Sequence, residues 1–153
     1  MINNLINKKF FLGQKLQKDI FEIICTKKIN TIIIGGPKGL GKRSFVLKLA
    51  KFILCNLELT KEIKPEFFDL NKFDFDQLKI TKSFHLFDNN SHPDFFYLND
   101  EEKKLGKTIP IENVRKFKNF FYKTDAISRV KIGIIDSIED LSINSQNLLL
   151  KTI

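Results

Sequence analysis

The feature that most constrains this chain is a glycine-rich turn between a β-branched run and an amphipathic segment. The run covers residues 31–34, and the segment over residues 41–55 has apolar side chains at helical spacing. The turn fits G-x-x-x-x-G-K, a motif that cradles phosphate when it follows a strand and opens a helix. We therefore predict a phosphate-binding loop (a P-loop, or Walker A motif). Its residues are Gly36, Pro37, Lys38, Gly39, Leu40, Gly41 and Lys42.

The chemistry of such a loop depends on the residues that follow it. Inward-pointing backbone N–H groups and the helix N-terminus form an anion site, and Lys42 would reach the β- and γ-phosphates. A Ser or Thr normally follows the lysine and holds Mg²⁺, whereas this chain has Arg43 and then Ser44. One helical step rotates a side chain by about 100°, so Ser44 does not take over that position. We expect ATP binding to be weak, with a bare anion or no ligand as alternatives, and Mg²⁺ to be disfavoured.

A second part of a nucleotide site is predicted at the end of a later strand. Residues 129–135 form an apolar run that ends at Asp136, where P-loop proteins carry the carboxylate that anchors the Mg²⁺ shell. The next residue is Ser137, and a serine without a partner is a poor general base. Glu139 and Asp140 are better explained as solvated turn residues. Because the magnesium hydroxyl and the water-activating carboxylate are both replaced, we expect impaired or absent hydrolysis.

The order of the predicted elements defines the fold class. Hydrophobic periodicity predicts helices over residues 14–27, 41–55 and 111–121, and a last helix from about residue 143 with Ser142 as its N-cap. Strands are predicted over residues 31–34, 94–98 and 129–135. This alternation predicts a three-layer α/β fold, a parallel sheet flanked by helices. Residues 56–90 fit no regular pattern, and we expect a variable insert with a helix and loops there.

Composition restricts the remaining function classes. The chain has 153 residues, of which 42% are hydrophobic and 29% charged, as in one globular domain. It has neither a secretory signal nor the roughly 18 apolar residues of a membrane helix, so we expect a cytoplasmic protein without a membrane partner. The net charge is +8, but the lysines are dispersed, which favours a compositional bias over a DNA-binding surface. Cys25 and Cys55 stand far apart in helical patterns, which predicts buried thiols and no zinc site.

Six short motifs follow one another along the chain, with a gap over residues 56–90. They are residues 11–14 (FLGQ), 36–42 (GPKGLGK), 91–94 (SHPD), 109–115 (IPIENVR), 135–141 (IDSIEDL) and 147–152 (NLLLKT). In this order they resemble the delta-prime subunits of bacterial DNA polymerase III clamp loaders, which are AAA+ proteins. The last predicted helix has no stop signal, so we expect residues 1–153 to be the N-terminal part of a truncated AAA+ domain.

The resemblance implies a function in DNA replication. It implies a clamp-loader subunit that assembles with gamma/tau and delta subunits, and that meets the sliding clamp and primed DNA through the assembled complex. Motor subunits of this family usually have Glu directly after the Walker B Asp, where this chain has Ser137. Two alternatives stay open: an active, ATP-hydrolysing motor subunit of the gamma/tau kind, and an unrelated small P-loop kinase. Arg43 and Ser137 favour the non-hydrolysing subunit over the motor.

Overall fold

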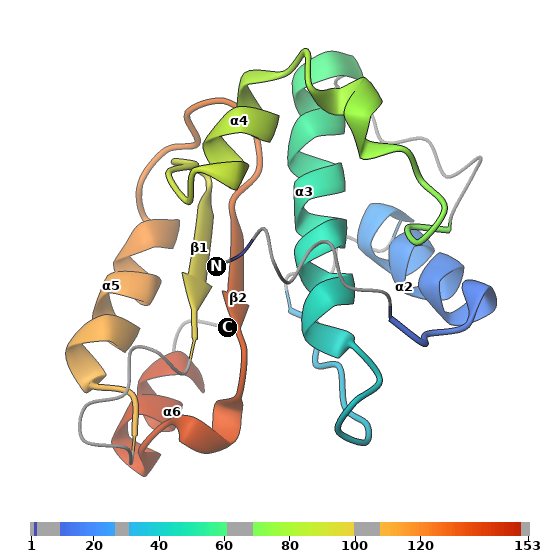
Figure 1. Ribbon diagram of the computed structural model, residues 1–153. Helices are drawn as coiled ribbons and strands as arrows, with labels where there is room; N and C mark the ends of the chain where they lie inside the picture. The colour runs from blue at the N-terminus through green and yellow to red at the C-terminus, as the bar shows by residue number, and fades with distance from the viewer. Residues whose placement is uncertain (1, 3–9, 27–30, 61–68, 100–107, 151–153) are drawn as a thin grey trace. The chain divides into compact units, whose positions relative to one another are not determined.

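The chain divides into two compact units, Met1–His92 and Pro93–Ile153. The structure is a computed structural model, and it describes residues 2, 10–26, 31–60, 69–99 and 108–150. Helices dominate the N-terminal unit, and the C-terminal unit contains a pair of strands with helices (Figure 1). Within the described residues, no helix is both long and apolar enough to span a bilayer. The prediction of one domain with a variable insert over residues 56–90 stays a prediction.

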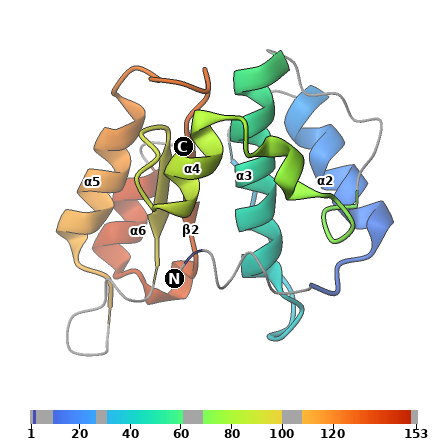
Figure 2. The same ribbon diagram turned by 45° about the horizontal axis from the view of Figure 1, so that its top comes forward.

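The N-terminal unit is built around one long helix. Its elements are α2 (Gln14–Thr26), α3 (Lys42–Thr60), the 3-10 helix η1 (Phe75–Leu78) and α4 (Lys82–Asp88). Helix α3 lies between α2 and α4 in both views (Figures 1 and 2). The helices predicted over residues 14–27 and 41–55 are confirmed, except that residue 27 lies outside the described residues and α3 continues to Thr60. The apolar stripe predicted for α3 is buried: Phe45, Leu49, Phe52 and Ile53.

Aromatic rings connect the elements of this unit. Phe52 on α3 meets Phe21 on α2 edge to face at 5.9 Å between ring centroids, and Phe73 at 4.9 Å. Phe73 in turn meets Phe75 of η1 at 5.0 Å. Such pairs contribute about 0.5–1.5 kcal/mol each beyond the burial of their area. This ladder of four rings therefore holds α2 and η1 against α3.

Charged side chains are also buried in the N-terminal unit. The Lys51 ammonium lies 2.5 Å from Oδ1 of Asp88 and 3.4 Å from the ring centroid of Phe84, so it is paired on both sides. Burial also lowers the pKa of Lys48, while the nearby Asp69 carboxylate acts in the opposite direction.

Burial raises the pKa of the Cys55 thiol to about 11, which confirms the buried thiol predicted there. The side chain of Cys25 lies outside the described residues.

A carboxylate from α3 caps the start of α4. The backbone N–H groups of Lys82 and Ser83 donate to the two oxygens of Glu58 at 3.0 and 2.8 Å. Burial raises the pKa of Glu58, but the hydrogen bonds from Ser83 and Lys82 outweigh it and hold the pKa below its usual value. Nε2 of the buried His92 lies 3.0 Å from the Ser83 hydroxyl. The histidine of the Ser-His-Pro-Asp motif is thus part of the packing of α4.

The strand predicted over residues 31–34 is wrong. These residues belong to no helix or strand, and Ile33 is 82% exposed. In the part of the chain that the structure describes, the sheet holds β1 and β2 alone, both in the C-terminal unit. A β-branched run becomes a strand only when a neighbouring strand satisfies its backbone groups. The described residues of the N-terminal unit offer no such neighbour.

The sheet of the C-terminal unit is parallel, as predicted. Strand β1 (Phe95–Leu98) pairs with β2 (Ile132–Ile135), and Phe96 lies opposite Gly133. Because side chains alternate along a strand, one face presents Phe96 and Leu98 together with positions 133 and 135. A Cβ added at Gly133 would lie 2.5 Å from Cζ of Phe121 and 2.6 Å from Cζ of Phe117. Glycine therefore lets α5 (Ile111–Phe121) approach this face closely.

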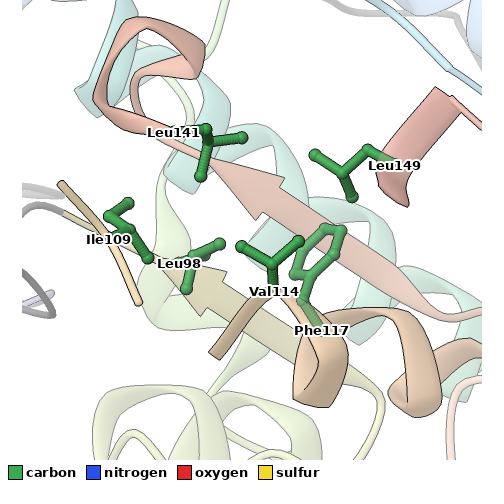
Figure 3. Packing of buried hydrophobic residues seen from close by; sticks show 6 residues of the cluster. All are labelled: Leu98, Ile109, Val114, Phe117, Leu141 and Leu149. Atoms are coloured by element: carbon green, nitrogen blue, oxygen red, sulfur yellow. The ribbon is translucent and has the colours of Figure 1, made fainter. Parts of the chain in front are cut away.

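Helices α5 and α6 (Ile143–Leu150) complete the core of this unit. Six buried apolar side chains come together between strands and helices (Figure 3): Leu98, Ile109, Val114, Phe117, Leu141 and Leu149. The bounds predicted for α5 are confirmed at both ends. The predicted N-cap of α6 is also confirmed, because the Ser145 N–H donates to Oγ of Ser142 at 3.3 Å. The last three residues of the chain lie outside the described residues.

The buried carboxylate of Asp94 fixes the loop that leads into β2. Its oxygens accept backbone N–H groups from Ala126 and Ile127, both at 2.7 Å, and from Ser128 at 2.9 Å. The Lys131 ammonium lies 3.7 Å from Oδ1. Directly after this turn, Arg129 has a left-handed φ of 56°. The strand predicted over residues 129–135 therefore begins only at Ile132, because a left-handed residue interrupts an extended chain.

Candidate phosphate-binding site

The predicted phosphate loop has the backbone conformation that its glycines permit. Gly36, Gly39 and Gly41 have φ angles of 144°, 91° and 74°. Residues with a Cβ rarely adopt such angles, whereas glycine does so at little cost. The loop leads directly into α3, whose first residue is Lys42. The Phe45 N–H donates to the Gly41 carbonyl at 2.9 Å, which joins the loop to the first helical turn.

The loop lysine is held against the loop itself. Nζ of Lys42 donates to the carbonyl oxygens of Gly36 at 2.6 Å and Pro37 at 2.7 Å. These bonds place a positive charge beside the backbone that the motif uses for anions. The helix N-terminus adds further partial positive charge there.

A neighbouring segment is fixed to the loop. The Phe11 N–H donates to the Leu40 carbonyl at 3.0 Å, while the Phe11 side chain is 77% exposed. Asn71 forms two hydrogen bonds with Phe10, the residue before Phe11. Its side chain accepts from the Phe10 N–H at 3.5 Å and donates to the Phe10 carbonyl at 3.0 Å. The Phe10 ring packs edge to face on Phe45 at 5.3 Å. Residues 10–12 therefore lie beside the loop.

Sequence reasoning missed two residues that position this segment. Asn71 is one, and the other is the buried Gln17, which donates to the Leu12 carbonyl at 2.9 Å and accepts from the Leu70 N–H at 3.1 Å. Both connect parts of the chain that are distant in sequence. Local patterns contain no signal for such contacts.

The two residues after the lysine do not provide a magnesium ligand. Arg43 occupies the position of the motif hydroxyl and is half-buried. Ser44 lies one helical step further on and is 4% exposed. Among the residues whose placement is described, no group of three or more His, Cys, Asp or Glu could hold a metal ion. The prediction that Mg²⁺ is disfavoured at this site stays a prediction.

The predicted Walker B residues follow β2. Asp136 is half-buried, and its N–H donates to the Leu98 carbonyl at 3.0 Å, which continues the strand pairing by one residue. Ser137 precedes the 3-10 helix η3 (Ile138–Asp140), which contains Glu139 and Asp140 as turn residues. Lys42 and Asp136 belong to different units, and each is described within its own. The convergence of the loop with Asp136 stays a prediction.

Comparisons with known proteins identify the family of the chain. The family described as DNA polymerase III, delta subunit, matches residues 13–153. The chain belongs to this family, which confirms the predicted resemblance and the P-loop fold class. It is 26% identical over 121 residues to the DNA polymerase III subunit delta' of Pseudomonas aeruginosa, an alignment that covers 79% of this chain. The same alignment covers 32% of that relative, so the chain spans about a third of its length.

Proposed function

We propose that this chain acts as a delta-prime-like subunit of the DNA polymerase III clamp loader. It takes part in assembling the complex that places the sliding clamp on primed DNA during replication, and its own ATP hydrolysis is weak or absent. Its partners are gamma/tau and delta subunits, and it meets the clamp and primed DNA through the assembled complex. This function places it in the cytoplasm.

One combination supports the proposal: the loop has glycines with positive φ and a lysine bonded to its backbone, while residues needed for hydrolysis are replaced. Three left-handed glycines and the lysine hydrogen bonds define the loop. At the same time, Arg43 stands at the magnesium position and Ser137 at the position of the water-activating carboxylate. Membership of the DNA polymerase III delta subunit family connects this combination with replication.

We assign nucleotide contacts to the loop and to the residues around it. Backbone N–H groups of the loop and the Lys42 ammonium would hold the phosphates, and the motif assigns the second part of the site to Asp136, which follows β2. The exposed ring of Phe11 is attached beside Leu40 and could cover the base. The proposed contact residues are Gly36, Pro37, Lys38, Gly39, Leu40, Gly41, Lys42, Arg43, Ser44 and Asp136.

If the chain were instead an active motor subunit, the purified protein would hydrolyse ATP at a substantial rate. A motor needs both the magnesium hydroxyl and the water-activating carboxylate, and the loss of either costs orders of magnitude in rate. Family membership disfavours the second alternative, an unrelated small kinase.

Reconstitution tests the proposal directly. We expect the intact protein to assemble with gamma/tau and delta subunits of its own organism and to be required for clamp loading on primed DNA. Lys42→Ala in this subunit should leave ATP turnover by the assembled complex unchanged within about twofold, because the turnover belongs to other subunits. Lys72→Ala, which alters an exposed lysine of the same unit, is the matched control.

Two results would contradict the proposal. One is failure of the intact protein to assemble with the other subunits. The other is robust ATP turnover by the purified protein that disappears in Lys42→Ala but not in Lys72→Ala. That second result would identify a motor subunit.

A further inference from the structure

The residues at the phosphate loop disagree with the metal that this fold class usually binds. Mg²⁺ needs an oxygen ligand directly after the loop lysine, and this chain has the guanidinium of Arg43 there. Ser44 cannot substitute, because it lies one helical step further on and is 4% exposed. A cation at the metal position repels a second cation, and no hydroxyl is available there to attract it.

We propose that Arg43 makes this loop select metal-free polyphosphates, such as free nucleoside di- and triphosphates, over their Mg²⁺ complexes. The inference rests on the phosphate site assigned under the proposed function. On this view the site binds the metal-free polyphosphate, and Arg43 is the residue that determines this choice.

Electrostatics favour the more negative ligand at this loop. Lys38, Lys42 and Arg43 lie within or next to the loop. They belong to a unit in which 16 lysines and arginines face nine acidic residues, a net charge of +7 over residues 1–92. Mg²⁺ cancels part of the negative charge of a polyphosphate, so the complex is attracted less strongly than the free ligand. The local charge alone therefore gives a preference for the free form.

The guanidinium can also bind phosphate oxygens that a metal ion would otherwise coordinate. It is planar, always charged, and offers paired N–H donors that match two phosphate oxygens. A lysine at this position would provide only a point charge. An arginine at position 43, the second residue of α3, thus stands one residue from the lysine that the motif directs to the phosphates.

Calorimetric titration of the intact protein with ATP and with ADP tests the inference. One series contains EDTA and the other excess Mg²⁺. We expect at least about tenfold tighter binding in EDTA, a difference that calorimetry measures easily. Arg43→Thr restores the motif hydroxyl and should reverse the preference. Arg43→Gln removes the charge and the paired guanidinium donors, and it should reduce the preference without creating a need for Mg²⁺.

Lys42→Ala is the control for binding at the loop and should weaken binding equally in both buffers. Circular dichroism checks that each variant folds, and the Arg43→Gln result stands if Arg43→Thr does not fold. Binding by the wild type that is equal or tighter in Mg²⁺, or absent in both buffers, would overturn the inference. Either result leaves the clamp-loader function intact if the same preparation still supports clamp loading, so the two failures are distinguishable.

Discussion

The two units of this chain reach a folded core by different means. The N-terminal unit is helical and has a net charge of +7. In the C-terminal unit, residues 93–153, ten lysines and arginines face nine acidic residues, and the core is a paired sheet under two helices. The basic character of the protein therefore lies almost wholly in the unit that carries the phosphate loop.

The contrast shows what each kind of element needs. Helix α3 forms from bonds within its own segment, so its sequence is sufficient to predict it. The run over residues 31–34 has the same β-branched character as β2, yet only β2 becomes a strand. The difference is the neighbour: β2 has β1 beside it, and residues 31–34 have no strand beside them in the described part of their unit.

Two buried charges, one in each unit, have different sets of partners. Lys51 has one carboxylate and one aromatic face as partners. Asp94 instead has three backbone N–H groups and a lysine. More hydrogen-bond donors depend on the Asp94 carboxylate than on the Lys51 ammonium. We therefore expect the loss of Asp94 to lower the free energy of unfolding more than the loss of Lys51. Four measurements test or refine this contrast.

The largest effect is expected for Asp94→Ala. The substitution leaves three N–H groups without their acceptor and removes the carboxylate beside Lys131, so the free energy of unfolding should fall by about 3–5 kcal/mol. Urea unfolding measures this change, and hydrogen exchange at residues 126–128 should accelerate. Asp125→Ala, an exposed carboxylate close in sequence, should stay within about 0.5 kcal/mol of wild type. Equal stability of the two variants would refute the role given to Asp94.

Lys51→Met should cost somewhat less, about 2–4 kcal/mol, because it removes the buried ion pair with Asp88. The side chain of Asp88 is 29% exposed, and water can therefore solvate part of its charge. The double variant Lys51→Met/Asp88→Asn should recover part of the loss, and Lys15→Met on the exposed surface of α2 is the control. A loss larger than that of Asp94→Ala would reverse the contrast between the units.

Gly133→Ala should cost about 1–3 kcal/mol through overpacking. The added methyl would meet the Phe121 and Phe117 rings at 2.5 and 2.6 Å, so a ring or the strand must move. Adding Phe121→Leu should restore part of the stability, since it removes the nearest ring. If thermal unfolding shows no change in the single variant, helix α5 does not lie as close to β2 as the structure places it.

Glu58→Gln is expected to have the smallest effect, about 1 kcal/mol or less near neutral pH. Because the folded-state pKa of Glu58 lies below its usual value of 4.5, ionised Glu58 stabilises the fold above that pH. This contribution is lost as the pH falls through the lowered pKa. The difference in unfolding free energy between wild type and variant should therefore shrink well below pH 4.5. A difference that does not depend on pH would exclude the charged cap, and Glu139→Gln serves as the control.

The sequence predicted the elements whose signals are local. Both ends of α5 and the Ser142 cap were predictable because spacing and capping act over a few residues. The start of β2 was not, because the left-handed conformation of Arg129 depends on the turn that Asp94 organises. The strand over residues 31–34 failed for the related reason that pairing is a property of two segments.

The candidate site divides in the same way. The motif alone predicted the loop, and the loop has the expected glycine conformations. Asn71 reaches residue 10 across 61 positions, and Gln17 joins Leu12 to the distant Leu70, so neither contact set has a local signature. The convergence of the loop with Asp136 stays a prediction of the motif.

The hydrogen-bond donors around Asp94 determine which substitutions the neighbouring loop tolerates. The donors of this loop are backbone groups, which every amino acid except proline possesses. Positions 126 and 127 can therefore accept almost any side chain without altering what the carboxylate receives, whereas proline at either position removes a donor outright. A saturation library over these two positions should thus be permissive, with proline as the common failure, while position 94 should accept almost nothing but aspartate.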